Sequence, residues 1–233
     1  MKRLAISLSL LFCLLASSVA QNMRDVRVGQ KVYHVSNTTD ERAVYKTEGV
    51  NAQNCFIVIS KQEFRLYVYE KVGRDTLLVA HYPVCYAKYA DNKKKRGDMR
   101  TPESTMKKPF TISQIQDASG WKHDFHDGRG SVKAYGNWFM RLVTPPHTGI
   151  GIHGSTNNES SIPGQDSEGC IRLRDADIIH LKSNYARVGT KVVIKPIGQG
   201  KLPFELRAEQ QLGNQYHSPQ AGYTLLPGAQ FVN

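Results

Sequence analysis

The sequence predicts a mainly β fold with one or two helices. Residues 55–59 form a continuous apolar run of strand length, and residues 64–69 then alternate between two faces with a period of two. Residues 77–84 form a third apolar run, and turn-like residues separate the three, which predicts an antiparallel meander. Only residues 175–185 have a clear helical pattern. This low helical content argues against a doubly wound α/β enzyme.

Further strands continue this pattern toward the C-terminus. They are expected at residues 109–115, 138–143, 149–153 and 191–197. Between them, residues 117–131 are rich in Gly, Asp and His, and residues 157–168 are polar, so both stretches are expected to be loops.

The chain divides into four parts. Residues 51–197 make up the strand-rich domain, and the polar residues 21–50 before it are expected to form one hairpin or a loose lead-in. Residues 198–233 carry Gln, Gly and Pro without periodicity and are expected to be a tail. Residues 1–20 combine a basic start, a short apolar run and small residues before the expected cleavage point, which is typical of a secretory signal peptide. No second apolar run is long enough to cross a membrane, so we expect a mature chain without a membrane span, exported to the periplasm or cell envelope.

The net charge of +11 at first suggests nucleic acid or another anionic partner. Loss of Lys2 and Arg3 with the signal peptide lowers the charge to +9, and residues 88–108, with eight basic and three acidic side chains, carry more than half of it. These residues contain no base-stacking motif, and the chain is expected to be exported, so nucleic acid is disfavoured as a partner. We expect instead a solvated basic face or attraction to an anionic cell-envelope polymer.

Three cysteines remain in the expected mature chain, an odd number. A disulfide between Cys55 and Cys85 would leave Cys170 free, but in a simple meander the first two lie at opposite ends of their strands, so we expect them to be buried and unpaired. The spacing His123-x-x-His126 is compatible with zinc. No second Cys or His pair accompanies it, so we expect two surface histidines and no metal site.

The most informative stretch links a histidine to a cysteine. An apolar strand ends at His153, and a loop then leads to Gly169-Cys170 and to Arg172. A glycine lets the backbone approach a substrate closely, and two consecutive N–H groups there can stabilise an oxyanion. A nearby imidazole turns a thiol into a thiolate nucleophile, and an arginine can hold a carboxylate or carbonyl of the substrate.

This stretch resembles the active-site motif of L,D-transpeptidase catalytic domains of the YkuD type. That family has His-Gly, a loop of similar length, and then Ser/Thr-His-Gly-Cys-Ile/Val-Arg. The chain has His153-Gly154 and then Ser167-x-Gly169-Cys170-Ile171-Arg172. Upstream, residues 100–103, 110–112 and 141–142 and the pair Tyr135-Gly136 fit as well. The resemblance covers residues 55–195 and implies an L,D-transpeptidase-like β-sandwich or barrel.

The resemblance also implies a reaction, acyl transfer on peptidoglycan stem peptides. Cys170 would attack the carbonyl that joins the L-centre of the third residue to a terminal D-amino acid. The terminal D-residue would leave as a thioester forms on Cys170, and an amine of another stem would then attack the thioester. His153 would move the proton. The remaining roles that the resemblance implies are orientation of the base by the Gly154 carbonyl, oxyanion binding by the N–H groups of Gly169 and Cys170, and substrate binding by Arg172, Ser167, Glu168 and Tyr135. It implies no metal and no organic cofactor.

One position departs from the family pattern. Glu168 stands where the family usually has histidine, directly before Gly169-Cys170. A carboxylate beside a cysteine raises the pKa of the thiol unless it is held away. Two alternatives therefore stay open: an L,D-carboxypeptidase or other hydrolase on the same fold, in which water replaces the amine, and a non-catalytic peptidoglycan-binding module.

Overall fold

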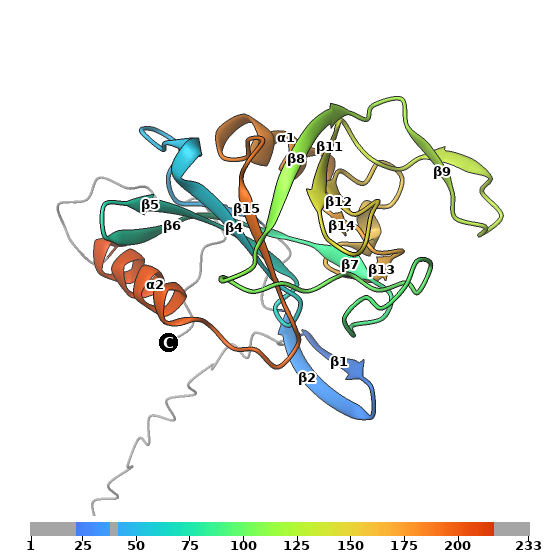
Figure 1. Cartoon of the computed structure of the whole chain (residues 1–233), viewed down its shortest axis with the longest axis horizontal. Coiled ribbons are helices and arrows are strands. Elements are labelled where there is room, and N and C mark those ends of the chain that lie inside the picture. Colours follow the sequence, from blue (N-terminus) through green and yellow to red (C-terminus); the bar gives the residue numbers. More distant parts are fainter. Residues whose placement is uncertain (1–21, 38–41, 217–233) are drawn as a thin grey trace, which may run out of the picture.

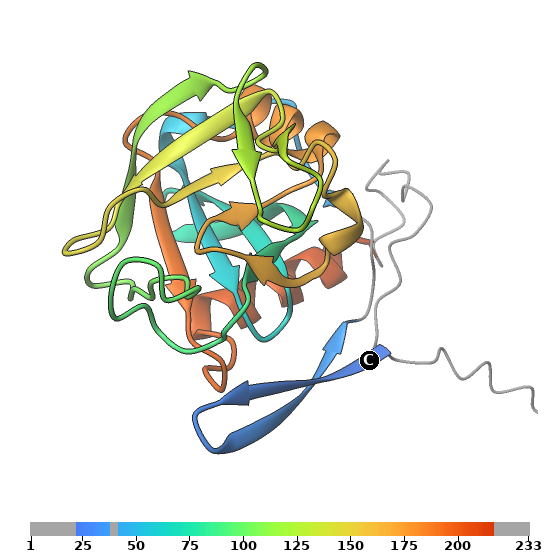
Figure 2. The same ribbon diagram turned by 90° about the vertical axis from the view of Figure 1, so that its right-hand side faces the viewer.

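The computed structural model describes residues 22–37 and 42–216 of the 233 in the chain (Figure 1). The expected signal peptide and residues 217–233 of the expected tail lie outside the described residues. Within the described ranges, no helix combines the length and apolar character needed to cross a membrane. The fold is mainly β with two α-helices, as predicted, and its large sheet curls into a half-barrel (Figure 2).

The large sheet has eleven strands. In order across the sheet they are β13 (Gly164–Ser167), β7 (Cys85–Ala87), β14 (Ile171–Arg172), β12 (Gly151–His153), β11 (Trp138–Val143), β8 (Phe110–Asp117), β15 (Lys191–Lys195), β4 (Cys55–Ser60), β5 (Arg65–Val72), β6 (Asp75–Pro83) and β3 (Ala43–Val44). The predicted meander is confirmed, because β4, β5 and β6 pair antiparallel in sequence order. β15 lies parallel to β4 and antiparallel to β8, and so joins the meander to the second half of the sheet.

Both faces of the central strands are covered, which explains why β4 is apolar at almost every position. Ile57 and Ile59 point into the main core inside the curl, whereas Phe56 and Val58 belong to a second apolar cluster on the other face. All four side chains are at most 6% exposed. A strand buried on both faces has a continuous apolar run in place of alternation.

Helix α1 (Asp175–Asn184) forms where the sequence predicts a helix. Its Ile178 and Leu181 are fully buried in the main core, and the helix packs beside β11 and β12. α1 therefore supports β12, the strand that ends at His153, and its neighbour β11.

Helix α2 (Pro203–Tyr216) corrects the expectation of a tail without periodicity. Phe204, Ala208 and Leu212 recur every fourth residue and cover the second apolar cluster over β6, as Figure 1 shows. A buried ion pair joins the helix to the sheet, with Lys195 Nζ 2.8 Å from Glu205 Oε2 and both side chains 1% exposed. The polar Gln-rich face of the helix hid this pattern in the sequence.

Residues before the meander form the predicted hairpin and one further strand. β1 (Asn22–Val28) pairs antiparallel with β2 (Lys31–Asn37) as a separate two-stranded sheet. β3 adds to the edge of the large sheet beside β6, and a 3-10 turn, η1 (Ala52–Asn54), precedes β4. Cys55 and Cys85 are both buried and unpaired, as expected.

Two stretches that we expected to be loops contain short regular elements. Residues 117–131 include β9 (Lys122–Asp124), which pairs with β10 (Ser131–Lys133); we call residues 122–133 the flap. Residues 157–168 include a 3-10 turn, η2 (Glu159–Ser161), and β13, which pairs in parallel with β7. These elements are short and polar, so their pairing depends on the tertiary fold and gives no hydrophobic pattern in the sequence.

Candidate active site

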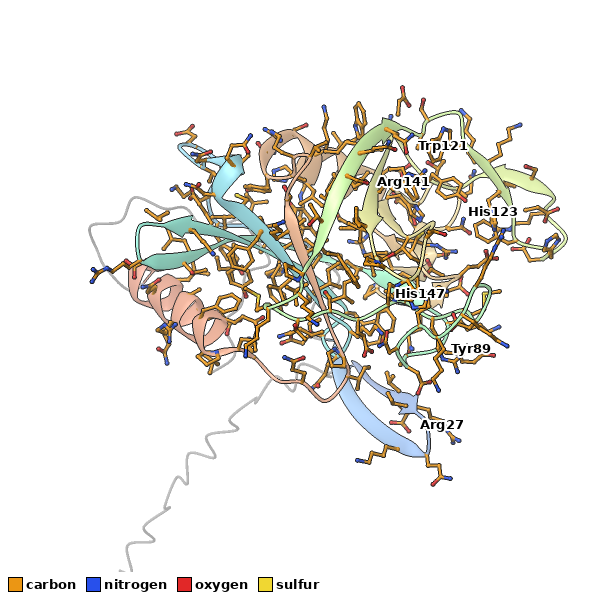
Figure 3. The ribbon with its side chains drawn as sticks, viewed as in Figure 1. Arg27, Tyr89, Trp121, His123, Arg141 and His147 are labelled. Atoms are coloured by element: carbon orange, nitrogen blue, oxygen red, sulfur yellow. The ribbon has the colours of Figure 1, made fainter. Side chains whose placement is uncertain are left out.

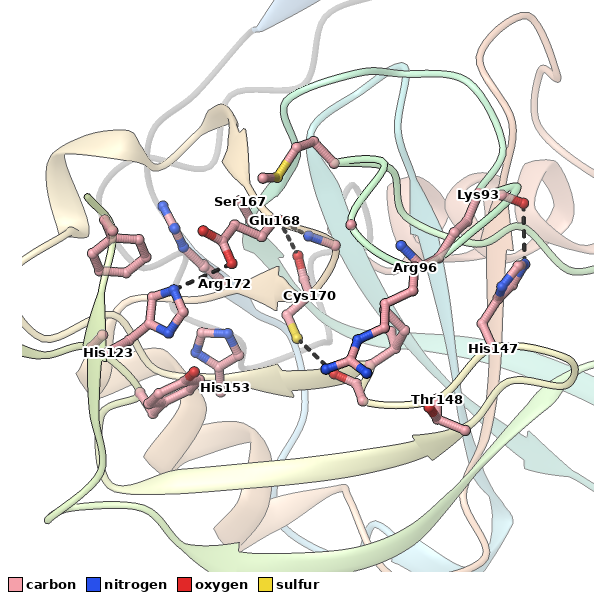
Figure 4. Close-up of a pocket in the computed structure, with 18 of the residues that line it drawn as sticks. Lys93, Arg96, His123, His147, Thr148, His153, Ser167, Glu168, Cys170 and Arg172 are labelled. Atoms are coloured by element: carbon pink, nitrogen blue, oxygen red, sulfur yellow. Dashed lines mark hydrogen bonds and ion pairs between the residues drawn. The ribbon is translucent and has the colours of Figure 1, made fainter. Parts of the chain in front are cut away.

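Two neighbouring strand ends bring the histidine and the cysteine of the motif together. β12 ends at His153, and β14 begins one residue after Cys170. The two strands pair in parallel, with Ile152 beside Ile171 and His153 beside Arg172. This pairing brings the two segments side by side, and the imidazole and the thiol line the same pocket, as Figure 4 shows.

His153 is held between two aromatic rings. Phe139 stacks on it with ring centroids 5.5 Å apart, and the Tyr135 ring centroid is 4.9 Å away. Nδ1 lies 2.6 Å from the Gly154 carbonyl oxygen, which only accepts, so Nδ1 carries the hydrogen and Nε2 keeps its lone pair. Burial lowers the pKa of His153 to about 3, with Arg172 adding to the effect and the Gly154 carbonyl opposing it. The imidazole is therefore neutral near pH 7 and can accept a proton at Nε2.

A close backbone approach fixes the Gly154 carbonyl. A Cβ at Gly154 would lie 2.7 Å from the Gly136 Cα and 2.5 Å from Asp175 Oδ1. Gly136 also has a φ of +64°, which favours glycine. Asp175, the first residue of α1, accepts hydrogen bonds from the Ser155 N–H at 2.7 Å and from the Thr156 hydroxyl. Only glycine fits at both positions, so this contact determines where the carbonyl points.

The Cys170 thiol is partly exposed to the pocket. Its Sγ lies 3.5 Å from the Gly149 carbonyl oxygen, to which the thiol donates. Burial raises the pKa of Cys170, and Glu168 raises it further, whereas a backbone hydrogen bond and nearby guanidinium groups act in the opposite direction. The resting state is therefore a neutral thiol in the same pocket as a neutral imidazole, so a thiolate forms readily only if a base takes the proton.

The turn before Cys170 is organised by Ser167. The Ser167 hydroxyl donates to the Cys170 carbonyl at 2.6 Å and accepts from the Gly169 N–H at 3.2 Å. The Gly169 N–H, which we expected to face an oxyanion, is thus engaged within the turn. The Cys170 N–H makes no hydrogen bond to any other residue in the described ranges. Gly169 has a φ of +150°, and the Thr101 hydroxyl donates to its carbonyl at 2.9 Å.

Arg172 places a buried positive charge at one side of the pocket. Its side chain is 3% exposed, and Nη1 lies 3.2 Å from Asp166 Oδ2 and 3.4 Å from the Ser161 hydroxyl. The guanidinium also lies 5.2 Å from the centre of the Phe125 ring. Asp166 is 65% exposed, so water screens its charge and leaves Arg172 positive toward the pocket.

The pocket has a volume of about 570 Å³ and is electropositive. Glu168 is the one acidic residue among those that line it, against several basic or imidazole side chains: Lys93, Arg96, Arg172, His123, His147 and His153. Figure 3 shows His123 and His147 on the side of the molecule away from α2, and Figure 4 shows Arg96 extending toward Cys170. Such a lining suits a ligand rich in carboxylates.

Part of the basic segment 88–108 forms one wall of this pocket. Lys93 Nζ lies 2.8 Å from Asp98 Oδ1, and both side chains are buried. Although burial opposes ionisation, Lys93 and the backbone N–H groups of Lys94 and Lys95 hold the pKa of Asp98 well below its usual range. Asp98 therefore shapes the loop and leaves Arg96 exposed beside the thiol.

The structure corrects the interpretation of His123 as a surface histidine. His123 lines the pocket with its side chain 30% exposed, and its Nε2 lies 3.2 Å from Glu168 Oε2. His126, the other histidine of the pair, is on the surface with its side chain 88% exposed. No group of three or more His, Cys, Asp or Glu side chains in the described part of the chain is arranged to hold a metal ion.

Three features of the site do not follow from the sequence. Arg96, which lines the pocket, stands out there only as part of a basic run, and Asp175, which holds the segment after His153, only as a helix start. The contact between His123 and Glu168 depends on the flap, and no spacing in the sequence indicates it. Asp175 had a detectable cue, because an acidic residue at the start of a helix often binds nearby backbone N–H groups.

The family model of the L,D-transpeptidase catalytic domain (YkuD) matches residues 55–194. The chain therefore belongs to the L,D-transpeptidase catalytic domain family, as the sequence motif predicts. No curated protein sequence matches the chain.

Several solved structures are similar to the chain. Bd1075 from Bdellovibrio bacteriovorus has 18% identity and a TM-score of 0.46, with 73% of this chain and 58% of that chain covered. The L,D-transpeptidase from Mycobacterium smegmatis has 17% identity and a TM-score of 0.41, with 61% of this chain and 58% of that chain covered. The helical cell shape determining protein Pgp2 from Campylobacter jejuni has 17% identity and a TM-score of 0.46, with 72% of this chain and 53% of that chain covered. The chain thus spans between 53% and 58% of the lengths of these three proteins.

Proposed function

We propose that this chain is an exported L,D-transpeptidase that remodels peptidoglycan through a thioester on Cys170, with residues 51–197 as its catalytic domain. The observation that carries the proposal is the state of His153: its Nδ1 is engaged by the Gly154 carbonyl, and its Nε2 is free in the pocket that holds Cys170. The electropositive lining supports a stem-peptide substrate, because stem peptides carry several carboxylates. The pattern of residues 1–20 supports export.

The first half of the proposed reaction forms the thioester. The Cys170 proton moves to His153 Nε2 as the sulfur attacks the carbonyl carbon between the third residue of the stem and its terminal D-amino acid. The Cys170 N–H stabilises the oxyanion. When the tetrahedral intermediate collapses, the C–N bond breaks, and the departing amine takes the proton from His153.

The second half transfers the acyl group. An acceptor amine gives a proton to His153 as its nitrogen attacks the thioester carbonyl. The C–S bond then breaks, and the sulfur regains a proton, which restores the neutral pair. If water takes the place of the amine, the same steps trim the stem. Arg172 and Tyr135 line the groove on the donor side, Gly154 and Ser167 position the base and the nucleophile, and Gly169 permits the turn between them.

Digestion of muropeptides with the purified mature protein tests the proposal, with Cys170→Ala as the matched control. New cross-linked dimers that require Cys170 support the transpeptidase, and shortened stems that require it identify a hydrolase on the same fold. If the muropeptides change in no way that depends on Cys170, both enzyme functions are contradicted, and a peptidoglycan-binding module is favoured.

Mass spectrometry after incubation with a carbapenem gives an independent test of the nucleophile. We expect an adduct on Cys170, because its thiol is open to the pocket while Cys55 and Cys85 are buried. Failure to modify Cys170 under conditions in which the protein stays folded contradicts the thioester mechanism.

A further inference from the structure

Glu168 and His123 form a contact that the reaction steps above do not use. Glu168 directly precedes Gly169-Cys170 in the sequence, and Glu168 and Cys170 line the same pocket. Its Oε2 lies 3.2 Å from His123 Nε2, and the two side chains are 44% and 30% exposed. Figure 4 shows the Glu168 side chain turned toward His123 and not toward the Cys170 sulfur.

We propose that His123 is a positioning residue that holds the Glu168 carboxylate away from Cys170, so that the thiolate can form. The inference rests on the proposed function, because it assumes that Cys170 is the nucleophile. It concerns only the thiol, however, and so can be tested without a peptide substrate.

The physical need for such a partner follows from the charges around the thiol. Negative charge beside a cysteine disfavours the thiolate, and Glu168 raises the pKa of Cys170. In the described ranges His123 is the one ion-pair partner of Glu168. Arg172, the buried cation of the pocket, lies 3.2 Å from Asp166 and forms no ion pair with Glu168 in the described ranges.

The remaining charged and titratable groups do not replace His123. On the wall formed by residues 88–108, Lys93 pairs with Asp98, and Arg96 extends toward Cys170. His147 Nε2 lies 3.1 Å from the Lys93 carbonyl oxygen. The other titratable or charged groups facing this region are Tyr135, Arg141, His153 and Arg172.

Contacts within the flap and with Tyr135 hold His123 in place. His123 is paired across the flap with Val132, and its ring packs edge-on against Phe125 with centroids 4.6 Å apart. The Tyr135 ring is 6.2 Å away on the pocket side. Arg129 ties the flap to the body, with Nη1 3.0 Å from the Asn157 carbonyl oxygen. The imidazole is therefore positioned before any ligand binds.

Alkylation of Cys170 by iodoacetamide, followed by mass spectrometry across a pH series, measures the availability of the thiolate directly. Below the thiol pKa, a shift of about half to one pKa unit changes the thiolate fraction roughly three- to tenfold. We expect His123→Ala to slow alkylation by about this factor and to move its pH profile upward. We expect Glu168→Gln to speed alkylation, and the double variant to match Glu168→Gln alone.

His126→Ala is the matched control, since His126 lies on the same flap, is exposed and does not line the pocket. Its alkylation rate should equal that of the unmodified sequence. The inference is overturned if His123→Ala alkylates at the original rate, or if it slows alkylation equally with and without Glu168. A slower rate for Glu168→Gln also overturns it. None of these results affects the proposed function, which instead fails if Cys170→Ala leaves muropeptide processing unchanged.

Discussion

The contact between Gly154 and Gly136 makes a sharp prediction for Gly154→Ala. The added Cβ would lie 2.7 Å from the Gly136 Cα, 2.5 Å from Asp175 Oδ1 and 3.1 Å from Ile178 Cγ2. Carbon atoms normally approach to about 3.5–4.0 Å, so the backbone must move by about 1 Å. We expect this overpacking to lower the free energy of unfolding by about 2 kcal/mol and the Tm by about 4–8 °C.

That shift also displaces the carbonyl that orients His153, which is 2.6 Å from Nδ1. A misplacement of about 1 Å in a catalytic group costs about 100-fold in rate, so acylation of Cys170 by a carbapenem should slow by about that factor. Time-resolved mass spectrometry measures the rate, and differential scanning fluorimetry measures Tm. Gly120→Ala is the control, because no atom lies within 4 Å of its added Cβ. If Gly154→Ala acylates at the same rate as Gly120→Ala, the argument that this carbonyl positions the base is wrong.

Three other predictions concern stability and the nucleophile turn. Lys195→Met leaves Glu205 buried without a cation and should cost about 3–5 kcal/mol in urea unfolding, whereas Lys195→Met with Glu205→Leu should recover most of that loss. Burial lowers the pKa of both His81 and His153 to about 3, so as the pH falls these histidines bind protons in the unfolded state before they do so in the folded state. The free energy of unfolding should therefore fall between pH 6.5 and 3, by about 1.4 kcal/mol per pH unit for each histidine, and His81→Gln should reduce that slope; an unchanged slope contradicts the assignment. Ser167→Ala removes both hydrogen bonds in the turn before Cys170, so it should lower Tm by a few degrees and slow carbapenem acylation about tenfold, whereas an unchanged rate would show that the turn holds without it.

The sequence predicted most of the sheet because its central strands are long and apolar. The strands from β4 to β6, β8, β11 and β15 and helix α1 lie close to their expected positions. β9, β10 and β13 are three or four polar residues long, so their pairing partners and not their own composition determine them. In α2, the residues that pack on the sheet recur only every fourth position, and the mostly polar residues between them concealed the helix.

The part of the candidate site that the sequence motif contains could be predicted. Cys170 and His153 lie in one pocket, as the motif suggests, because the strands that hold them are neighbours. The Glu168–His123 contact was not predictable, since a three-residue strand in the flap places the histidine. The hydrogen bond from Gly169 to Ser167 also depends on the backbone conformation of the turn, which residue types alone do not specify.

The parallel pairing of β12 and β14 has a consequence for how the site can diversify. The positions of His153 and Cys170 are set by direct strand pairing, not by the length of the chain between them. The connection includes exposed positions such as Ser160, so residues can be inserted or exchanged there without moving the reacting pair. The connection is thus a natural place for substrate preference to evolve while the chemistry stays the same.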